Sequence, residues 1–223
     1  MSGKIDMGLF SSLYKNILNI TAAIVLSVST PVFAFQPVIP VTGQVVTNSI
    51  TPAESNLMSL QDFAEAVKDG NADKIKGLYA ADVFSLRVIQ QPAGKPGFVS
   101  PIEGVATQFG MASSNKVTGM LAHNYASGRY FFKLELEDTV AVVYGDGSVK
   151  EYTITMIKRY QALSPKSASS EFVDLDTNEK LSATGLFNKM YTGKHHLTLQ
   201  TCIQEGNEDS WGRLFIIAEP VEA

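Results

Sequence analysis

The chain has 223 residues, of which 45% are hydrophobic and 18% are charged. This length and composition suit one globular domain with a sizeable core and an appendage. The net charge of −4 gives no electrostatic footprint for binding nucleic acid. The single cysteine excludes an intramolecular disulfide and a cysteine-based structural zinc site.

The N-terminal region 1–34 predicts export. Its apolar run 17–35, ILNITAAIVLSVSTPVFAF, is uncharged and about as long as the shortest membrane span. The small residues Val32 and Ala34 stand where a signal peptidase cuts, which would leave Phe35 as the first residue. The pattern fits a cleaved signal peptide, an uncleaved membrane anchor or a buried terminal helix, in that order. We therefore expect the protein to be secreted or held at the outer face of the cytoplasmic membrane.

Two segments separate this region from the main domain. Residues 35–53 contain three prolines and no charge, which is typical of an extended linker. Residues 54–82 predict a helical appendage, because apolar residues follow the i, i+3, i+4, i+7 spacing of one helix face, namely Leu60, Phe63, Ala64 and Val67. Asn71 is expected to cap a second short helix that carries Ile75 and Leu78. The appendage is expected to pack on the main domain, with a role as a lid as the alternative.

The region 83–223 is mostly β in pattern. Short runs rich in Val, Ile, Phe, Tyr and Thr recur along it: VFSLRVIQQP, VTGMLAHNY, RYFFKLEL, TVAVVYGDGSVKEYTITMIKRYQAL, HHLTLQTCI and WGRLFIIAEP. Gly145-Asp146-Gly147 predicts a hairpin turn. Only SATGLFNKMYTG, residues 182–193, is typical of a helix in this region. Many short strands with turns between them predict a closed barrel or a sandwich.

Cys202, the only cysteine, is a candidate nucleophile, with an inert core thiol as the alternative. His195 and His196 are close to it in sequence. They precede it in one alternating run, however, and an extended strand of about 3.3 Å per residue puts His196 roughly 20 Å away. They are expected at a strand edge on the surface. Because they are adjacent, they also point to opposite faces of a strand, which disfavours a shared metal ion. His123, at the end of another apolar run, is the histidine that tertiary structure could bring to Cys202, with a hydrogen-bonded structural histidine as the alternative.

Arg213 is the third candidate. The loop IQEGNEDS joins the Cys202 run to the run that contains Arg213, so a hairpin would return Arg213 to the level of Cys202. A guanidinium there favours the thiolate and stabilises a developing oxyanion. The alternative is an arginine that packs its stem on Trp211 and keeps its head in water.

These residues resemble the signatures of the sortase family. TLQTC at Thr198 to Cys202 is similar to the family's Thr-Leu-x-Thr-Cys motif. LAHN around His123 and WGRLF around Arg213 are similar to the strands that hold its histidine and arginine. The order agrees, and the resemblance covers roughly residues 83–220. It implies a closed eight-stranded sortase-like β-barrel with a groove that leads to the cysteine.

The resemblance also implies an activity, that of a cysteine transpeptidase. Cys202 would attack a backbone carbonyl of a sorting signal similar to Leu-Pro-x-Thr-Gly in an exported protein. His123 would act first as the general acid and then as the base, and Arg213 and Thr201 would bind the oxyanion. An amine on a cell-wall precursor or a protein would then resolve the thioester. The helical appendage 54–82 departs from the family's common core.

Other functions stay open at this stage. Water in place of the amine would make the protein a cysteine peptidase or amidase, and loss of catalysis would leave an exported peptide-binding barrel. No cofactor is expected. Some sortases use calcium, for which the candidate ligands are carboxylates in turns, namely Glu135, Glu137, Asp138 and the VDLDTNE segment. Such carboxylates are usually only solvated.

Overall fold

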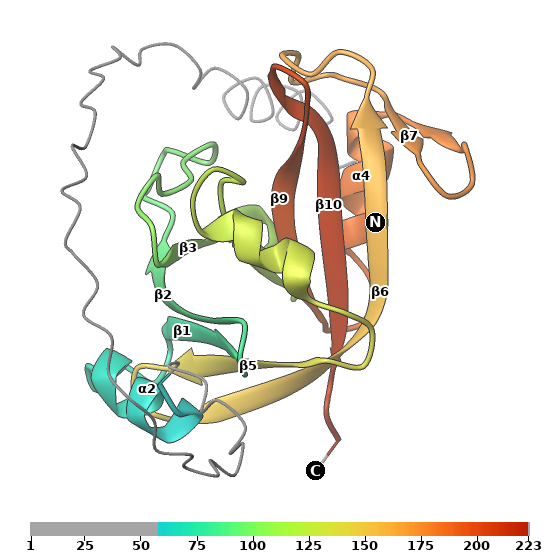
Figure 1. Cartoon of the computed structure of the whole chain (residues 1–223). Helices are drawn as coiled ribbons and strands as arrows, with labels where there is room; N and C mark the ends of the chain where they lie inside the picture. Colours follow the sequence, from blue (N-terminus) through green and yellow to red (C-terminus); the bar gives the residue numbers. More distant parts are fainter. Residues whose placement is uncertain (1–57, 223) are drawn as a thin grey trace, which may run out of the picture. The chain divides into compact units, whose positions relative to one another are not determined.

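The computed structural model describes residues 58–222 (Figure 1). The predicted signal or anchor segment 1–34 and the predicted linker 35–53 lie outside these residues. In the part of the chain that is described, no helix is long and apolar enough to span a bilayer.

The ten strands found in residues 58–222 form one sheet whose order is β10-β9-β4-β3-β2-β1-β5-β6-β7-β8. Strand β6 also pairs with β10, which closes eight strands into a barrel and leaves β7 and β8 outside it. The closed eight-stranded barrel expected from the sequence is thereby confirmed. The strands are β1 Ile75–Ala80, β2 Phe84–Gln90, β3 Val105–Gln108, β4 Thr118–Leu121, β5 Thr139–Tyr144, β6 Val149–Ala162, β7 Phe172–Asp174, β8 Lys180–Leu181, β9 Leu197–Glu205 and β10 Glu208–Pro220.

Buried side chains lie on both faces of the long strands. Alternate residues of β9 and β10, such as Leu199 and Leu214, fill the barrel interior. The intervening residues face outward, where α4 (Ala183–Tyr191) covers them. The ring of Tyr191 meets the ring of Phe215 at 6.1 Å in an edge contact. The helix predicted within 182–193 is confirmed, and Ser182 caps it.

The first helix of the predicted appendage is also confirmed. Helix α2 (Leu60–Val67) begins after Ser59, whose side chain accepts a hydrogen bond from the Asp62 N–H. Phe63 and Ala64 are buried and pack against Val143 of β5. The predicted apolar stripe therefore docks the helix on the outside of the barrel.

The second helix of the appendage was a wrong prediction. Residues 75–80 are strand β1, which pairs with both β2 and β5 and is part of the barrel. A β-bulge between Ile75 and Gly77 shifts the alternation by one residue. Ile75 and Leu78 therefore both reach the interior at a spacing of three, which imitates one face of a helix.

The predicted strand RYFFKLEL was wrong as well. This segment lies mainly in a 3₁₀ helix, η1 (Ser127–Lys133). Phe131 and Leu134 both enter the barrel interior, and their spacing of three fits the period of that helix. A short helix α3 (Gly110–Ser113) between β3 and β4 had no clear signal in the sequence.

The hairpin predicted at Gly145-Asp146-Gly147 is confirmed. It joins β5 to β6, and Gly147 has a φ of 90°, which a residue with a side chain rarely adopts. Asp146 accepts hydrogen bonds from the backbone and the hydroxyl of Ser148, which close the turn.

Candidate active site

Cys202 of β9 and Arg213 of β10 are directly opposite each other in an antiparallel pair. Side chains at such positions lie on the same face of the sheet, with Cβ atoms about 5 Å apart. The hairpin expected from the sequence therefore forms. Gln200, two residues before Cys202, accepts a hydrogen bond from the Tyr191 hydroxyl at 2.6 Å, which puts this face of β9 on the side of α4. The site thus lies on the outside of the barrel.

His123 reaches the same level from the other side of β9. Strand β4 pairs with β9 in parallel, with Leu121 opposite Gln200, and the Ala122 N–H donates to the Gln200 carbonyl at 3.2 Å. His123 follows Ala122 directly, so it lies just beyond the end of β4 on the side of Cys202. Cys202 and Arg213 therefore form a row across β9 and β10, and His123, just beyond the end of β4, extends this row on the other side of β9.

The surroundings of His123 are partly apolar and well defined. Its ring stacks on the ring of Tyr125, with the centroids 4.8 Å apart and an angle of 14° between the planes. Burial lowers the pKa of His123, and a hydrogen bond with the Val99 backbone opposes this effect. The imidazole is consequently biased toward its neutral form, which is the form that accepts a proton from a thiol.

Tyr125 is a site residue that the sequence analysis missed. Its side chain is 62% exposed, although it stacks on His123. Partial burial raises the pKa of Tyr125, and the charges of Cys202 and Asp209 raise it further. The neighbouring Asn124 donates to the Asp209 carbonyl at 3.0 Å, which ties this loop to the β9–β10 hairpin. The only sequence signal for this role was that an aromatic residue follows His123 by two positions.

Arg213 is buried and oriented by backbone groups. Its Nη1 donates to the carbonyl oxygens of Ser210 at 2.9 Å and Gly212 at 2.8 Å. The guanidinium carbon lies 5.9 Å from the centroid of the Phe172 ring. The guanidinium thus packs on Phe172, and the residue as a whole is 8% exposed, unlike the solvated arginine that was the alternative.

Thr201 lies on the other face of β9. Alternation turns its side chain into the barrel, where it is 2% exposed and its hydroxyl has no hydrogen-bond partner among the described residues. The hydroxyl packs against Gly128 of η1. The Thr201 hydroxyl therefore points into the barrel, whereas the predicted oxyanion site lies on the outer face with Cys202.

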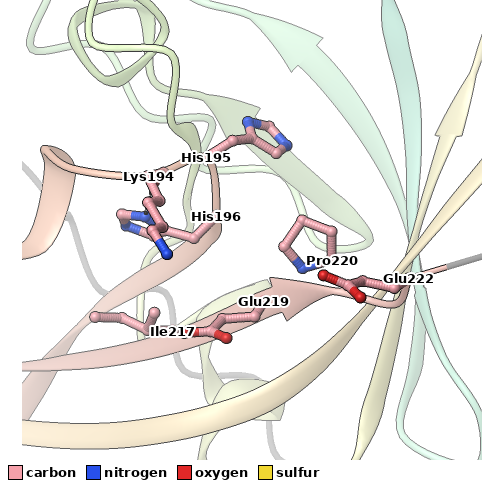
Figure 2. A pocket seen from close by; sticks show the side chains of 7 residues that line it. All are labelled: Lys194, His195, His196, Ile217, Glu219, Pro220 and Glu222. Carbon is pink, nitrogen blue, oxygen red and sulfur yellow. Dashed lines mark hydrogen bonds between the residues drawn. The ribbon is translucent and has the colours of Figure 1, made fainter.

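His195 and His196 lie at the opposite end of β9 from Cys202. They line a pocket of about 380 Å³ with Lys194, Ile217, Glu219, Pro220 and Glu222 (Figure 2). His195 is exposed, as expected, and contacts the Tyr152 hydroxyl and the Lys116 carbonyl. His196 is buried instead, contrary to the expectation. Its ring nitrogens lie within hydrogen-bond distance of the carbonyls of Lys194 and Met190, which compensates for the burial.

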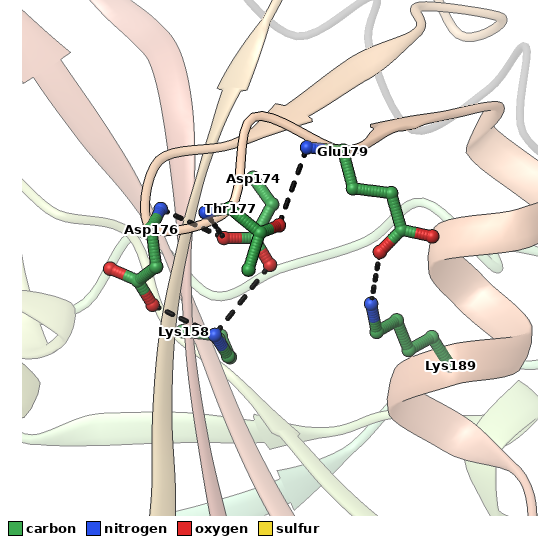
Figure 3. A network of polar contacts seen from close by, with 6 residues as sticks. All are labelled: Lys158, Asp174, Asp176, Thr177, Glu179 and Lys189. Carbon is green, nitrogen blue, oxygen red and sulfur yellow. Dashed lines mark hydrogen bonds and ion pairs between the residues drawn. The ribbon is translucent and has the colours of Figure 1, made fainter.

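The carboxylates considered for calcium lie outside this row. In VDLDTNE, Asp174 and Asp176 share the ammonium of Lys158, at 3.7 and 2.8 Å from its Nζ (Figure 3). The Lys158 ammonium therefore already occupies the space between these two carboxylates. Within residues 58–222, no group of three or more His, Cys, Asp or Glu side chains is arranged to hold a metal ion.

No protein-family model and no curated protein matches the sequence. Among solved structures, the chain is similar to sortase A of Listeria monocytogenes, with a TM-score of 0.42 and 14% identity over 66% of this chain and 88% of that one. It is similar to sortase C of Clostridium perfringens with the C-terminal cell wall sorting motif, with a TM-score of 0.44 and 11% identity over 74% and 84%. A third is sortase E1 of Streptomyces coelicolor with a tripeptide in the active site, with a TM-score of 0.44 and 19% identity over 70% and 91%.

Proposed function

We propose that the protein is a sortase-type cysteine transpeptidase that acts on exported proteins. The observation that carries the proposal is that Arg213, on β10, and His123, just beyond the end of β4, lie on either side of the β9 residue Cys202. A thiol, an imidazole and a guanidinium meet there from three segments that are distant in sequence. This is the combination that nucleophilic catalysis at a carbonyl requires.

The first half of the proposed reaction forms a thioester. His123 takes the proton of Cys202, and the thiolate sulfur attacks the carbonyl carbon of a peptide bond in the sorting signal. Arg213 donates hydrogen bonds to the oxygen as it becomes negative. When the carbon–nitrogen bond breaks, the imidazolium of His123 gives its proton to the leaving amine.

The second half transfers the acyl group. An incoming amine, on a cell-wall precursor or another protein, attacks the thioester after His123 removes its proton. The new amide forms and Cys202 leaves as a thiolate. If water enters instead, the same site hydrolyses the peptide, which is the activity of a cysteine peptidase. Action at the cell surface fits the predicted export segment 1–34.

The sole cysteine makes a direct test possible. A sorting-signal peptide with a thiol-reactive group in place of the scissile bond should modify the folded protein once, at Cys202. The Cys202→Ala variant should take up no label and show no turnover. Absence of label in folded wild-type protein, where a generic alkylating reagent does react, would remove the proposal.

Product analysis separates the two reactions. Wild-type protein is incubated with a sorting-signal peptide at increasing concentrations of a primary amine. A product in which the amine replaces the leaving group supports transpeptidation. Hydrolysis alone at every amine concentration would assign the site to a peptidase.

A further inference from the structure

The catalytic row continues beyond Arg213 into a buried polar pair. On β10, Arg213 is opposite Tyr160 of β6, and Tyr160 is in turn opposite Asp174 of β7. All three side chains lie on the outer face of the sheet, because Tyr160 belongs to the cluster under α4 and Phe172 of β7 shares that cluster. With strands about 4.8 Å apart, the backbones of Arg213 and Asp174 are roughly 10 Å apart.

Arg213 makes no ion pair with any residue that the structure describes. Its hydrogen bonds go to the backbone carbonyls of Ser210 and Gly212. A guanidinium at 8% exposure normally pairs with a carboxylate, because an unpaired buried charge is costly. Arg213 therefore keeps its charge available although a carboxylate lies two strands away.

The carboxylate of Asp174 already has partners on the side that faces away from Arg213. Asp174 is 1% exposed, and its Oδ1 accepts hydrogen bonds from the N–H groups of Asp176 and Thr177, while Lys158 lies beside Oδ2 (Figure 3). Burial acts to raise the pKa of Asp174, but these hydrogen bonds, the Lys158 charge and the Tyr160 hydroxyl together lower it. Asp174 is thus a buried anion that Lys158 and the turn hold in place.

Tyr160 stands between the two charges. Its side chain is fully buried, and its ring meets the ring of Phe215 edge-on at 5.9 Å and 77°, which fixes its orientation. Burial raises the pKa of the Tyr160 hydroxyl, and the charge of Asp174 on the neighbouring strand raises it further. The ring of Phe172, against which the Arg213 guanidinium packs, adds a second apolar wall.

We propose that Tyr160 is a positioning residue that separates Arg213 from Asp174 and keeps the guanidinium free to serve the Cys202 face. Without the tyrosine ring, the buried guanidinium and carboxylate would attract each other strongly and form a charge-assisted pair. Arg213 would then turn from β9 toward β7. The role of Arg213 at Cys202 rests on the proposed function. The separation of Arg213 from Asp174 by Tyr160 is independent of that function.

The test uses the full chain and two readouts. The first is the rate at which iodoacetamide alkylates Cys202 at neutral pH, which needs no peptide and reports the cation that favours the thiolate. The second is kcat/KM for a sorting-signal peptide. Tyr160→Leu, which keeps an apolar side chain but removes the ring, should lower both. The peptide turnover should fall about 10²-fold, as when one oxyanion donor is lost.

Two further variants show whether the effect acts through the charges. Asp174→Asn keeps an acceptor for the turn and removes the anion, so Tyr160→Leu combined with Asp174→Asn should recover most of both lost rates. In an Arg213→Ala background, Tyr160→Leu should change the alkylation rate no further. The matched control Tyr160→Phe keeps the ring and should stay close to wild type, and thermal melting confirms that each variant is folded.

Each outcome decides the proposal. A Tyr160→Leu variant that is folded and reacts like wild type overturns it, as does a loss that Asp174→Asn fails to rescue. A loss in Tyr160→Phe equal to that in Tyr160→Leu would assign the effect to the hydroxyl and reject separation by the ring. If wild type turns over no sorting peptide while alkylation follows the expected pattern, the proposed function fails and this inference stands.

Discussion

The ring of Tyr125 stacks on the ring of His123 with the centroids 4.8 Å apart and the planes 14° from parallel. The Asn124 side chain ties the same loop to the Asp209 carbonyl, so the stack is held next to the β9–β10 hairpin. An exposed aromatic residue in this position covers one face of the imidazole. It therefore controls both the orientation of His123 and its contact with water.

We expect Tyr125→Ala to raise the pKa of His123 toward its ordinary value of 6.5, because burial is what lowers it. The titration of the His123 ring protons by NMR measures this shift. With its ring free to rotate, the variant should also lose about tenfold or more in kcat. The control Tyr125→Phe keeps the stack and should preserve the titration. A His123 titration that is unchanged in Tyr125→Ala would show that the stack does not shield the ring.

The lowered pKa of His123 also predicts how folding stability depends on pH. Above pH 6.5 the ring is neutral in both states, so His123 adds no pH dependence. As the pH falls below 6.5, the unfolded chain takes up a proton that the folded protein binds less readily, and the free energy of unfolding decreases. The decrease ends once the pH is below the folded pKa.

Urea unfolding between about pH 5 and 8 measures this dependence. Replacing His123 by Gln removes the titrating group and keeps a side-chain amide that can donate to the Val99 backbone. The part of the slope just below pH 6.5 should therefore become smaller in His123→Gln. An identical slope in the variant would place the titrating group elsewhere in the molecule.

The sequence predicted those parts of the site that depend on local pairing. Cys202 and Arg213 meet because a short loop joins their strands, and alternation within β9 was enough to set aside His195 and His196. The position of His123 depends on the parallel pairing of β4 with β9, which joins segments nearly eighty residues apart. That pairing has no local signal, so the sequence singled out His123 only because His195 and His196 were set aside and because of the resemblance to a family.

The errors have equally physical causes. The bulge in β1 gives Ile75 and Leu78 the spacing of a helix, and η1 buries an aromatic run that by composition suits a strand. The expected role of Thr201 in the oxyanion site stays a prediction, although adjacent residues of a strand face opposite sides and its hydroxyl is turned away from the Cys202 face. Tyr160 had no sequence signal at all, since its place depends on two strand registers.

Replacement of Thr201 by Val tests whether its hydroxyl serves the oxyanion site on the outer face or only fills the barrel interior. Its hydroxyl is buried without a partner among the described residues, so an isosteric methyl group removes an unsatisfied polar atom. We expect a free energy of unfolding equal to or about 1 kcal/mol above that of wild type. Turnover of the sorting peptide should also stay close to wild type. A loss of about 10²-fold in kcat without unfolding would restore the hydroxyl to the oxyanion site.

Gly128 supports His123 from inside the barrel. Its N–H donates to the His123 carbonyl at 2.8 Å, and its φ is not in the left-handed region, so the need for glycine is steric. An added Cβ would lie 2.7 Å from the carbonyl oxygens of Ala122 and His123 and would overlap the Thr201 hydroxyl. Two of these three neighbours are backbone atoms, which cannot move away without shifting the segment that leads from β4 to His123.

We therefore expect Gly128→Ala to destabilise the protein by about 1–3 kcal/mol, the usual cost of overpacking. Because the displaced atoms belong to His123 and its neighbour, kcat should fall even under conditions in which the variant is fully folded. The matched control is Gly110→Ala, whose Cβ would touch only the Gln91 Oε1 at 3.5 Å, an ordinary contact. Urea unfolding and peptide turnover of the two variants measure the difference. Equal stability and equal turnover in both would mean that the backbone of His123 tolerates displacement and that the site is not held from this side.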